Sequence, residues 1–258
     1  MTADGASEAV PGEAAFQNFI RLDPSRIALL LDFDGTLVEI AATPDAVRVS
    51  DDLRASLARL LKKTGGTLAL VSGRPVADLD RLLAPLVLPI VGGHGAEMRL
   101  HGDEIMHVVA PLPDALRRRL AEACAFDPGI VMEDKGYSVA LHYRLAPTQE
   151  ERLRRHVVAA RAAFPDEKIE VLPGKAMFEV KRSGVSKGEA LRALMRQPPF
   201  AGRQPVFIGD DVTDESAFAS LPELGGIGFS VAREFAGLAG VFSSPAQLRD
   251  ALQVLATD

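Results

Sequence analysis

The apolar run at residues 27–31 leads directly into Asp32-Phe33-Asp34-Gly35-Thr36. A short apolar run that ends abruptly at polar turn residues is typical of a strand buried in a parallel sheet. Asp32 and Asp34 would then leave the sheet at the carboxyl end of that strand, where open α/β sheets bind their ligands. On this segment alone, an acidic turn that binds a structural cation is the alternative to a reactive site.

Strand and helix patterns alternate through two long stretches of the chain. After the first strand, leucines at helical spacing mark one face of a helix that ends at Gly65-Gly66. Further strands are expected at 67–71, 87–91 and 205–208, and further helices at 75–83, 186–195 and 214–221. This alternation predicts a doubly wound, Rossmann-like parallel α/β sheet. Asp32, Ser72 and Asp210 each follow a predicted strand, so we expect them to converge in one cleft.

The pattern changes between residues 106 and 182. Helices are expected at 113–123 and 148–164, with strands at 130–134 and 137–143 and two more after the second helix. Tight turns at Lys135-Gly136 and Pro173-Gly174-Lys175 predict antiparallel hairpins. We therefore expect an inserted α+β cap at 106–182, a core formed by 21–105 and 183–258, and a mobile tail at 1–20.

Composition restricts the function classes. The chain has 258 residues, 47% of them hydrophobic, and a formal net charge of −6. Its 29 Lys and Arg are scattered among 35 Asp and Glu without basic blocks, which argues against nucleic-acid binding. The first twenty residues lack a secretory signal, and no apolar run has transmembrane length. We expect a cytoplasmic protein with a small-molecule substrate, no membrane contact and no obligatory protein partner. The single cysteine, Cys124, is expected to be a buried structural thiol.

The Asp32 segment suits phosphoryl transfer. A carboxylate can attack phosphorus to form an aspartyl phosphate, and Asp32 is the first acid after the strand. Asp34 could protonate the leaving alcohol and then deprotonate the attacking water. Attack on a dianionic ester requires charge neutralisation, which points to Mg²⁺ held by one or two carboxylates.

A second acidic segment, Gly209-Asp210-Asp211-Val212-Thr213-Asp214-Glu215, follows another apolar run. Four acids within six residues repel one another unless some face water or a cation. Asp210, beside the strand end, is the expected metal ligand. For Asp214 and Glu215, metal binding and a place in the first turn of the next helix are equally consistent with the sequence.

Two further segments could contact a phosphoryl group. Ser72 can donate its hydroxyl, although a Ser-Gly turn is often only a helix cap. Arg74 could contact the phosphoryl group or face the cap, although an exposed arginine is equally consistent with the sequence. Lys187 lies in Ser186-Lys187-Gly188-Glu189, which has the pattern of a capping box. A lysine at the first helical position is unfavourable beside the helix dipole, and a bound anion would resolve that conflict.

These four segments, each beside a predicted strand end, resemble the haloacid dehalogenase superfamily of phosphohydrolases from about residue 26 onward. The resemblance implies that Asp32 is the nucleophile, Asp34 the acid/base, and Ser72 and Lys187 contacts of the phosphoryl group. It also implies that Asp210 binds Mg²⁺ together with Asp32 and the backbone carbonyl of Asp34.

Within that superfamily, segments 94–97 and 209–215 and the intervening cap are similar to the trehalose-6-phosphate phosphatases. That family binds its sugar with a Glu-x-Lys on one cap strand and a Glu on another, which implies sugar contacts by Glu133, Lys135 and Glu179. The period of two along a strand adds Lys175 to the face of Glu179. Without the resemblance, these residues would be taken as solvated faces of cap strands. His94 either contacts the sugar or holds the turn after its strand.

The resemblance implies Mg²⁺-dependent hydrolysis of trehalose 6-phosphate to trehalose and phosphate through an aspartyl phosphate. Another sugar phosphatase, such as a sucrose-phosphate phosphatase, or a phosphosugar mutase would share the core chemistry and differ in the cap. A sugar-phosphate-sensing module without turnover is the alternative from another class. It predicts the loss of a catalytic side chain, whereas Asp32, Asp34, Lys187 and Asp210 are all present.

Overall fold

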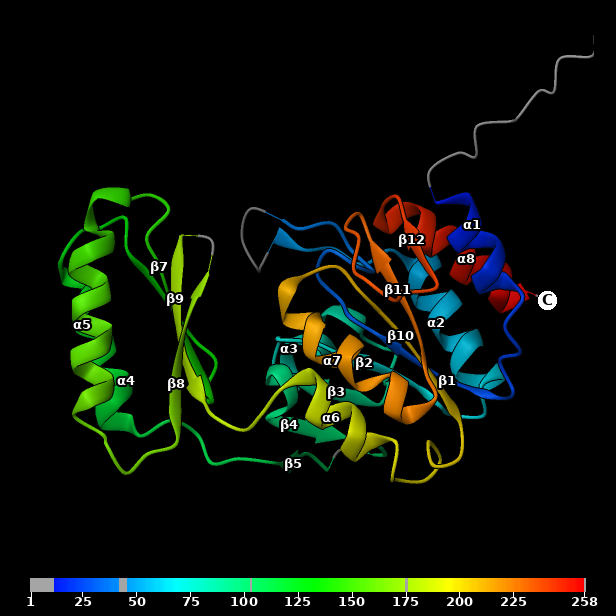
Figure 1. The fold of residues 1–258 in the computed structure, drawn as a ribbon, viewed down its shortest axis with the longest axis horizontal. Helices are drawn as coiled ribbons and strands as arrows, with labels where there is room; N and C mark the ends of the chain where they lie inside the picture. The colour runs from blue at the N-terminus through cyan, green and yellow to red at the C-terminus, as the bar shows by residue number, and fades with distance from the viewer. Residues whose placement is uncertain (1–11, 42–45, 103, 175, 258) are drawn as a thin grey trace, which may run out of the picture. The chain divides into compact units, whose positions relative to one another are not determined.

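A computed structural model of the chain describes residues 12–41, 46–102, 104–174 and 176–257 (Figure 1). It divides into two compact units, one comprising residues 1–105 and 186–258 and the other residues 106–185. The second unit is therefore an insertion into the first. The sequence predicted this insertion at residues 106–182, and the compact unit ends three residues later.

The larger sheet has eight strands in the order β12-β11-β10-β1-β2-β3-β4-β5. Its strands run parallel from β12 to β3, and β4 pairs antiparallel with β3. This is the expected doubly wound architecture, with one antiparallel strand at the edge of the parallel part. The strands are β1 (Ile27–Leu31), β2 (Leu68–Val71), β3 (Ile90–Gly92), β4 (Glu97–Arg99), β5 (Met106–His107), β10 (Gln204–Gly209), β11 (Ile227–Val231) and β12 (Gly240–Phe242).

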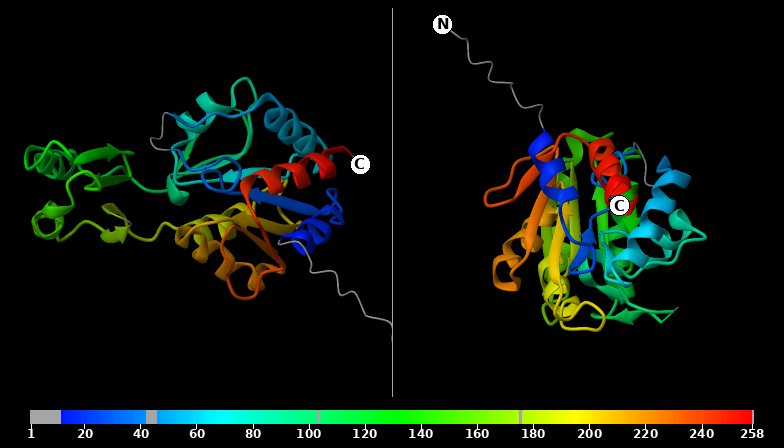
Figure 2. Two further views of the ribbon diagram at one scale, coloured as in Figure 1. Left: turned by 90° about the horizontal axis from the view of Figure 1, so that it is seen from above. Right: turned by 90° about the vertical axis from the view of Figure 1, so that its right-hand side faces the viewer.

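Helices cover both faces of this sheet (Figure 2). Alternate side chains of β1 explain the two layers, because Leu29 and Leu31 belong to one buried cluster and Ala28 and Leu30 to another. The first cluster includes residues of α1, α2, α3 and α8, and the second includes residues of α6 and α7. The helices are α1 (Glu13–Ile20), α2 (Asp51–Lys63), α3 (Val76–Leu83), α6 (Lys187–Leu194), α7 (Glu215–Ser220) and α8 (Pro245–Thr257), with short 3-10 turns η2 (Gly93–Gly95), η5 (Val212–Asp214) and η6 (Pro222–Leu224).

The N-terminal segment differs from the expected mobile tail at 1–20. Residues 1–11 lie outside the described part of the chain, but α1 packs on the core from Glu13 onward. Phe19 is fully buried, with its ring 5.6 Å from that of Phe229 and 5.8 Å from that of Phe242. Ala15 lies one helical turn earlier on the same buried face. Phe16 and Ile20 pack against the same core while partly exposed, so this apolar face covers only two turns, which is a short pattern for predicting a helix from sequence.

We predict that Phe19→Ala lowers the free energy of unfolding by about 3–5 kcal/mol, because it empties a fully enclosed aromatic site between two strands. Urea unfolding followed by circular dichroism measures this change. Gln17→Ala on the same helix is the control and should change the midpoint little. An unchanged midpoint for Phe19→Ala would contradict the packing of α1.

The second unit is a four-stranded antiparallel sheet in the order β6-β7-β9-β8. Figure 1 shows α4 and α5 on one side of it, and Leu141, Val180, Leu116 and Val157 belong to the core between them. Both expected hairpins are present, between β6 and β7 and between β8 and β9. Cys124 is half-buried rather than fully buried. The elements are β6 (Val131–Asp134), β7 (Ser138–His142), β8 (Ile169–Gly174), β9 (Met177–Arg182), α4 (Asp114–Ala121), η3 (Glu122–Ala125), η4 (Pro147–Gln149) and α5 (Glu150–Ala162).

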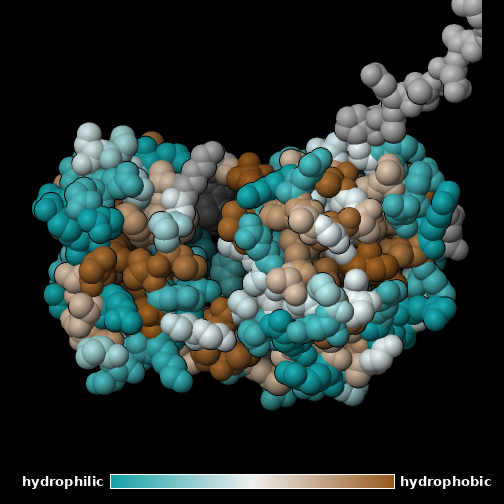
Figure 3. Space-filling view, viewed as in Figure 1, coloured by the Kyte–Doolittle hydropathy of each residue, from teal (hydrophilic) through white to brown (hydrophobic). Residues whose placement is uncertain are grey.

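The surface drawn in Figure 3 carries hydrophilic side chains over much of its area, with apolar side chains in smaller patches between them. Among the described residues, no helix has the length and the apolar character needed to cross a bilayer.

Candidate active site

The carboxyl ends of three adjacent parallel strands meet at one edge of the larger sheet. Asp32 follows β1, Ser72 follows β2 and Asp210 follows β10, and β1 lies between the other two strands. The backbone N–H of Asp32 donates to the carbonyl of Ile208 at 2.9 Å, which continues the pairing of β1 with β10 by one residue. Asp32 and Ser72 are only 5% and 1% exposed. The sheet topology therefore holds both side chains in a desolvated position.

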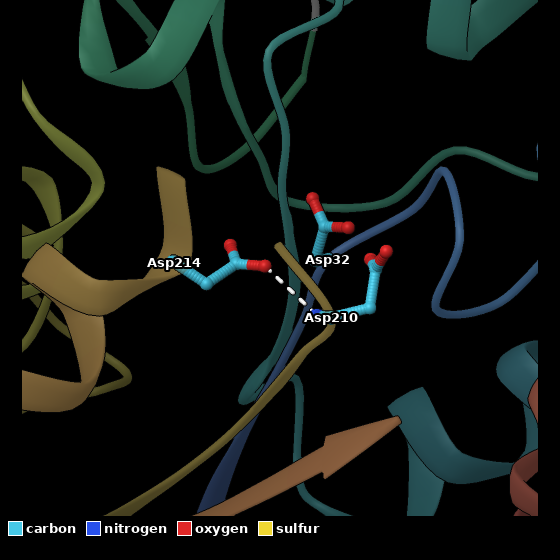
Figure 4. A group of neighbouring side chains, drawn as sticks. All are labelled: Asp32, Asp210 and Asp214. Atoms are coloured by element: carbon cyan, nitrogen blue, oxygen red, sulfur yellow. Dashed lines mark hydrogen bonds between the residues drawn. The ribbon is translucent and has the colours of Figure 1, made fainter. Parts of the chain in front are cut away.

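Three carboxylates gather at this edge (Figure 4). Asp32, Asp210 and Asp214 each offer an oxygen atom, and these atoms all lie within 4.8 Å of one another. Lys187 Nζ donates to Asp32 Oδ1 at 2.5 Å and to Asp214 Oδ1 at 2.6 Å. The side chains of Lys187 and Asp214 are 3% and 0% exposed. A single buried ammonium thus bridges two of the three carboxylates.

Burial and charge dominate the electrostatics of this group. Burial lowers the pKa of Lys187, but the negative charges of Asp32 and Asp214 outweigh it and raise the pKa above its ordinary value. Lys187 therefore stays protonated. Burial raises the pKa of Asp32 well above its ordinary value, with Lys187 opposing the shift and the charges of Asp214 and Asp210 adding to it. The pKa of Asp210 is also raised, first by burial.

Two glycines let the acidic loops approach each other. A Cβ on Gly35, whose φ is +85°, would lie 2.2 Å from Asp210 Oδ2. A Cβ on Gly209 would lie 2.4 Å from Asp214 Oδ2. Thr36, fully buried, donates its hydroxyl to Asp210 Oδ1 at 2.8 Å. The Gly-Thr pair of the first acidic segment therefore positions the carboxylate of the second.

Asp214 has a larger role than its sequence position indicated. Its Oδ2 accepts from the backbone N–H groups of Asp210 and Asp211 at 2.9 and 3.0 Å, while its Oδ1 accepts from Lys187. Asp211 completes a capping box with Asp214 around the short η5 turn. The spacing of these acids in the sequence was consistent with a functional role for Asp214, but it was equally consistent with the first turn of a helix. Asp214 in fact serves both the turn and the buried lysine.

Asp34 lies outside this cluster of carboxylates. Arg74 Nε and Nη2 donate to its two oxygens at 2.6 and 2.8 Å, which is a bidentate ion pair. The side chain of Arg74 is 11% exposed and that of Asp34 is 35% exposed. Arg74 was expected to contact a phosphoryl group or to face the cap, and in this structure it pairs with Asp34, the expected acid/base residue. The two residues are forty positions apart, so no local sequence pattern predicts this contact.

Ser72 lies in the loop after β2, and this loop contacts the turn that carries His94 after β3. Its Oγ accepts the N–H of Arg74 at 3.2 Å, which leaves the hydroxyl proton available for donation. The backbone N–H of His94 donates to the Ser72 carbonyl at 2.9 Å. A Cβ on Gly73 would lie 2.4 Å from the imidazole of His94. His94 has a φ of +57°, so the turn that carries it adopts a left-handed conformation.

Lys187 occupies the first position of α6, as the sequence predicted. Ser186 caps this helix by accepting the N–H of Glu189 at 3.2 Å. A full capping box would also have the Glu189 carboxylate accept the backbone N–H of Ser186. That part of the prediction is wrong, because the Glu189 carboxylate accepts from Arg192 Nη1 at 2.7 Å. The nearby arginine competes successfully for an exposed carboxylate. The anions that offset the positive charge of Lys187 are Asp32 and Asp214.

Two of the expected sugar-binding residues of the second unit share one face of its sheet. Glu133 on β6 and Glu179 on β9 both pair with Ala140 on β7, so their side chains point to the same side. Glu133 lies 3.6 Å from Lys135 Nζ and 3.2 Å from His142 Nε2. The hydrogen bond from His142 lowers the pKa of Glu133 despite partial burial. Sequence reasoning missed His142.

Glu179 is 7% exposed, and within the described part of the chain its Oε1 has no hydrogen-bond partner. A buried carboxylate oxygen without a donor is costly, so the geometry suits a ligand that supplies a hydroxyl group. Lys175, the remaining residue of this set, lies outside the described residues.

A divalent cation fits the core cluster by its donor chemistry. Both oxygens of Asp214 already accept from Lys187 and from backbone N–H groups, so Asp32 and Asp210 are the two carboxylates that could bind a cation. Asp32 and Asp210 each offer an oxygen within 4.8 Å of the other, and two carboxylates this close repel each other unless a proton or a cation lies between them. One or two carboxylates with other oxygen ligands form the usual protein contribution to a Mg²⁺ site.

Known proteins with similar sequences identify the family. The profile of the trehalose-phosphatase family matches residues 30–237, which include all four motif segments. The chain belongs to the trehalose-phosphatase family. It is therefore a phosphoric monoester hydrolase of the haloacid dehalogenase superfamily.

Two curated members of the trehalose-phosphatase family match most of the chain. A probable trehalose-phosphate phosphatase of Sinorhizobium fredii is 44% identical over 229 residues, which cover 88% of this chain and 85% of the relative. The trehalose-6-phosphate phosphatase of Escherichia coli is 42% identical over 212 residues, which cover 80% and 78%. Both relatives are matched over most of their own length.

Solved structures show the same fold. The C-terminal domain of the trehalose-6-phosphate phosphatase of C. albicans superposes with a TM-score of 0.77 at 25% identity, covering 94% of this chain and 95% of that domain. The expected fold, a doubly wound α/β core with an inserted α+β cap, is thereby confirmed for this member of the trehalose-phosphatase family.

Proposed function

We propose that this enzyme hydrolyses trehalose 6-phosphate to trehalose and phosphate, with Mg²⁺ as cofactor and Asp32 as nucleophile. The observation that carries the proposal is the buried Asp32–Lys187–Asp214 bridge beside Asp210 at the carboxyl ends of β1 and β10. The two relatives that match most of the chain are both named for a trehalose-phosphate phosphatase activity, which supports the substrate.

The reaction proceeds in two displacements. An oxygen of Asp32 attacks phosphorus and forms a P–O bond while the bond from phosphorus to the sugar oxygen breaks. The sugar oxygen takes a proton from Asp34, and trehalose leaves. Water then attacks the aspartyl phosphate, Asp34 accepts the proton of that water, and the P–O bond to Asp32 breaks. Phosphate leaves and Asp32 is regenerated.

The acid/base step requires a rearrangement of one ion pair. In this structure both oxygens of Asp34 accept hydrogen bonds from Arg74, so the carboxylate is turned toward the guanidinium. Proton transfer to the leaving oxygen therefore requires Asp34 to exchange Arg74 for the substrate. The phosphoryl group offers Arg74 an anionic partner in return, which reconciles the expected phosphate contact of Arg74 with its observed position.

Ser72 and Lys187 bind the transferring phosphoryl group. The Ser72 hydroxyl donates to a phosphoryl oxygen, and the ammonium of Lys187 neutralises charge on the group as Asp32 attacks. Mg²⁺ bound to Asp32, Asp210 and the carbonyl of Asp34 would neutralise further negative charge of the ester. Burial of these groups strengthens each interaction, since competing water is absent.

Sugar recognition belongs to the second unit. We assign contacts with sugar hydroxyls to Glu133, Lys135 and Glu179, together with Lys175, because carboxylates and ammonium groups pair well with hydroxyls. The unpartnered Oε1 of Glu179 and the shared strand face of Glu133 and Glu179 support this assignment. His94, which packs against Gly73, remains a candidate contact of the sugar.

A substrate panel tests the proposed function. Purified protein with Mg²⁺ is supplied with trehalose 6-phosphate, sucrose 6-phosphate, glucose 6-phosphate and p-nitrophenyl phosphate, and phosphate release is measured. We expect kcat/KM to be highest for trehalose 6-phosphate and activity to be lost with a chelator. A preference for another sugar phosphate would replace the substrate but keep the reaction. No release from any ester would favour a sensing module.

We predict that Glu133→Ala lowers kcat/KM for trehalose 6-phosphate by about tenfold to a hundredfold and leaves p-nitrophenyl phosphate nearly unaffected. Remote binding energy from the sugar is lost, whereas an aryl ester never uses it. Glu151→Ala, an exposed position on α5, is the control and should change neither substrate. Equal losses on both esters would remove Glu133 from the sugar site.

A further inference from the structure

Glu97 makes a contact that neither the motifs nor the proposed reaction assigns. It begins β4, and its Oε2 accepts the backbone N–H of Val76 at 2.8 Å. Val76 is the first residue of α3, and the preceding cap position is Pro75, whose side chain makes no capping hydrogen bond. Glu97, on β4, therefore supplies a hydrogen-bond acceptor to the N-terminus of α3 that the cap residue of that helix does not supply. Its negative charge also suits the positive end of the helix.

Three backbone features reinforce this contact. The N–H of Gly93 donates to the Arg74 carbonyl at 3.0 Å, and the N–H of His94 donates to the Ser72 carbonyl at 2.9 Å. A Cβ on Gly92 would lie 2.9 Å from both the Arg74 carbonyl oxygen and the Val76 nitrogen. Residues 92–94 thus lie against the loop 72–76. The Glu97 side chain contacts the same loop at its last residue, Val76, where α3 begins.

The loop 72–76 carries the two side chains that the reaction uses here. Ser72 is almost completely buried, and its Oγ accepts from the N–H of Arg74 at 3.2 Å. The guanidinium of Arg74 forms the bidentate ion pair with Asp34. A shift of the α3 N-terminus would move the Ser72 hydroxyl and the Arg74 guanidinium together, because both depend on the same five-residue loop.

We infer that Glu97 is a positioning residue for phosphoryl transfer, which tethers the α3 N-terminus to β4 and thereby fixes Ser72 and Arg74. This inference rests on the proposed function of that loop. Glu97 itself touches no reacting atom. Its loss acts on the chemical step, since catalytic groups displaced by about 1 Å can cost about a hundredfold in rate.

A second link between the same two elements provides a matched control. Asp80 on α3 accepts from Arg99 on β4 through both of its oxygens, at 2.5 and 2.6 Å. Arg99 is 4% exposed and belongs to the strand that begins with Glu97. Asp80→Ala therefore weakens the packing of α3 on β4 without touching the loop 72–76. A merely structural role for Glu97 predicts similar behaviour of the two variants.

The experiment measures kcat, KM and Tm for wild type, Glu97→Ala, Glu97→Gln and Asp80→Ala, with p-nitrophenyl phosphate and Mg²⁺. Because this ester lacks a sugar, the result does not depend on the identity of the natural substrate. We expect Glu97→Ala to lower kcat about tenfold or more with KM within about twofold. Glu97→Gln keeps an acceptor oxygen and should keep kcat within about threefold. Asp80→Ala should lower Tm and keep kcat.

Wild-type kcat in a folded Glu97→Ala protein would overturn the inference, as would an equal loss of kcat in Asp80→Ala. If Glu97→Ala fails to fold, Glu97→Asp decides, because it keeps the charge and shortens the reach by one methylene group. A severalfold loss of kcat in Glu97→Asp supports the tether, and a wild-type value contradicts it. Failure of the proposed function would be seen separately, as wild-type protein that releases no phosphate.

Discussion

Asp32→Asn is expected to reduce phosphate release from trehalose 6-phosphate by about 10⁴-fold or more, because an amide oxygen cannot replace the attacking carboxylate. The same variant should form no phosphoenzyme. Wild-type protein mixed with ³²P-labelled substrate and quenched in acid should retain label that alkali or hydroxylamine releases. Substrate turnover and label retention together measure this prediction.

Asp250→Asn on α8, an exposed position, is the control for the change of carboxylate to amide. It should retain wild-type turnover. Because Asp32 accepts from Lys187 at 2.5 Å, the Asp32→Asn protein also needs a Tm measurement to show that it is folded. A folded Asp32→Asn protein with substantial turnover would show that another group attacks phosphorus.

Lys187→Met is expected to affect both stability and turnover. The ammonium lies between Asp32 and Asp214 with 3% of its side chain exposed, so its removal leaves two buried carboxylates without their cation. Breaking a buried ion pair from one side destabilises a protein by about 3–5 kcal/mol. Turnover should fall at least about a hundredfold, since a charge that stabilises the transferring phosphoryl group is lost.

Urea unfolding and steady-state kinetics on trehalose 6-phosphate measure the two effects of Lys187→Met. Lys62→Met on α2, an exposed lysine, is the control and should change neither quantity by much. Mg²⁺ should be present in excess in the kinetic measurement, so that weakened cation binding does not account for the loss. A stable variant with near wild-type turnover would contradict the role of Lys187 in the buried bridge.

The sequence predicted the parts of the molecule that local patterns encode. The apolar runs before Asp32 and Asp210 became β1 and β10, paired in parallel as expected. Ser186 caps α6, and Lys187 follows it at the first helical position. In each case the signal lies within a few residues, namely the apolar period, a turn residue or a capping side chain.

Contacts between distant segments had no such signal. The pairing of Arg74 with Asp34 and the tether from Glu97 to Val76 join residues 40 and 21 positions apart. The burial of Phe19 depends on Phe229 and Phe242, which lie more than two hundred residues later. All three features depend on which strands are neighbours in the sheet: β1 and β2 for Arg74 with Asp34, β3 and β4 for Glu97, and β11 and β12 for Phe19.

The most direct test of the central claim is inorganic phosphate release from trehalose 6-phosphate by purified wild-type protein, with Mg²⁺ and with excess chelator. We predict rapid release with Mg²⁺, little release with chelator, and recovery when Mg²⁺ is restored. Absence of release from trehalose 6-phosphate under any of these conditions, from protein with a cooperative thermal transition, would contradict the proposed function.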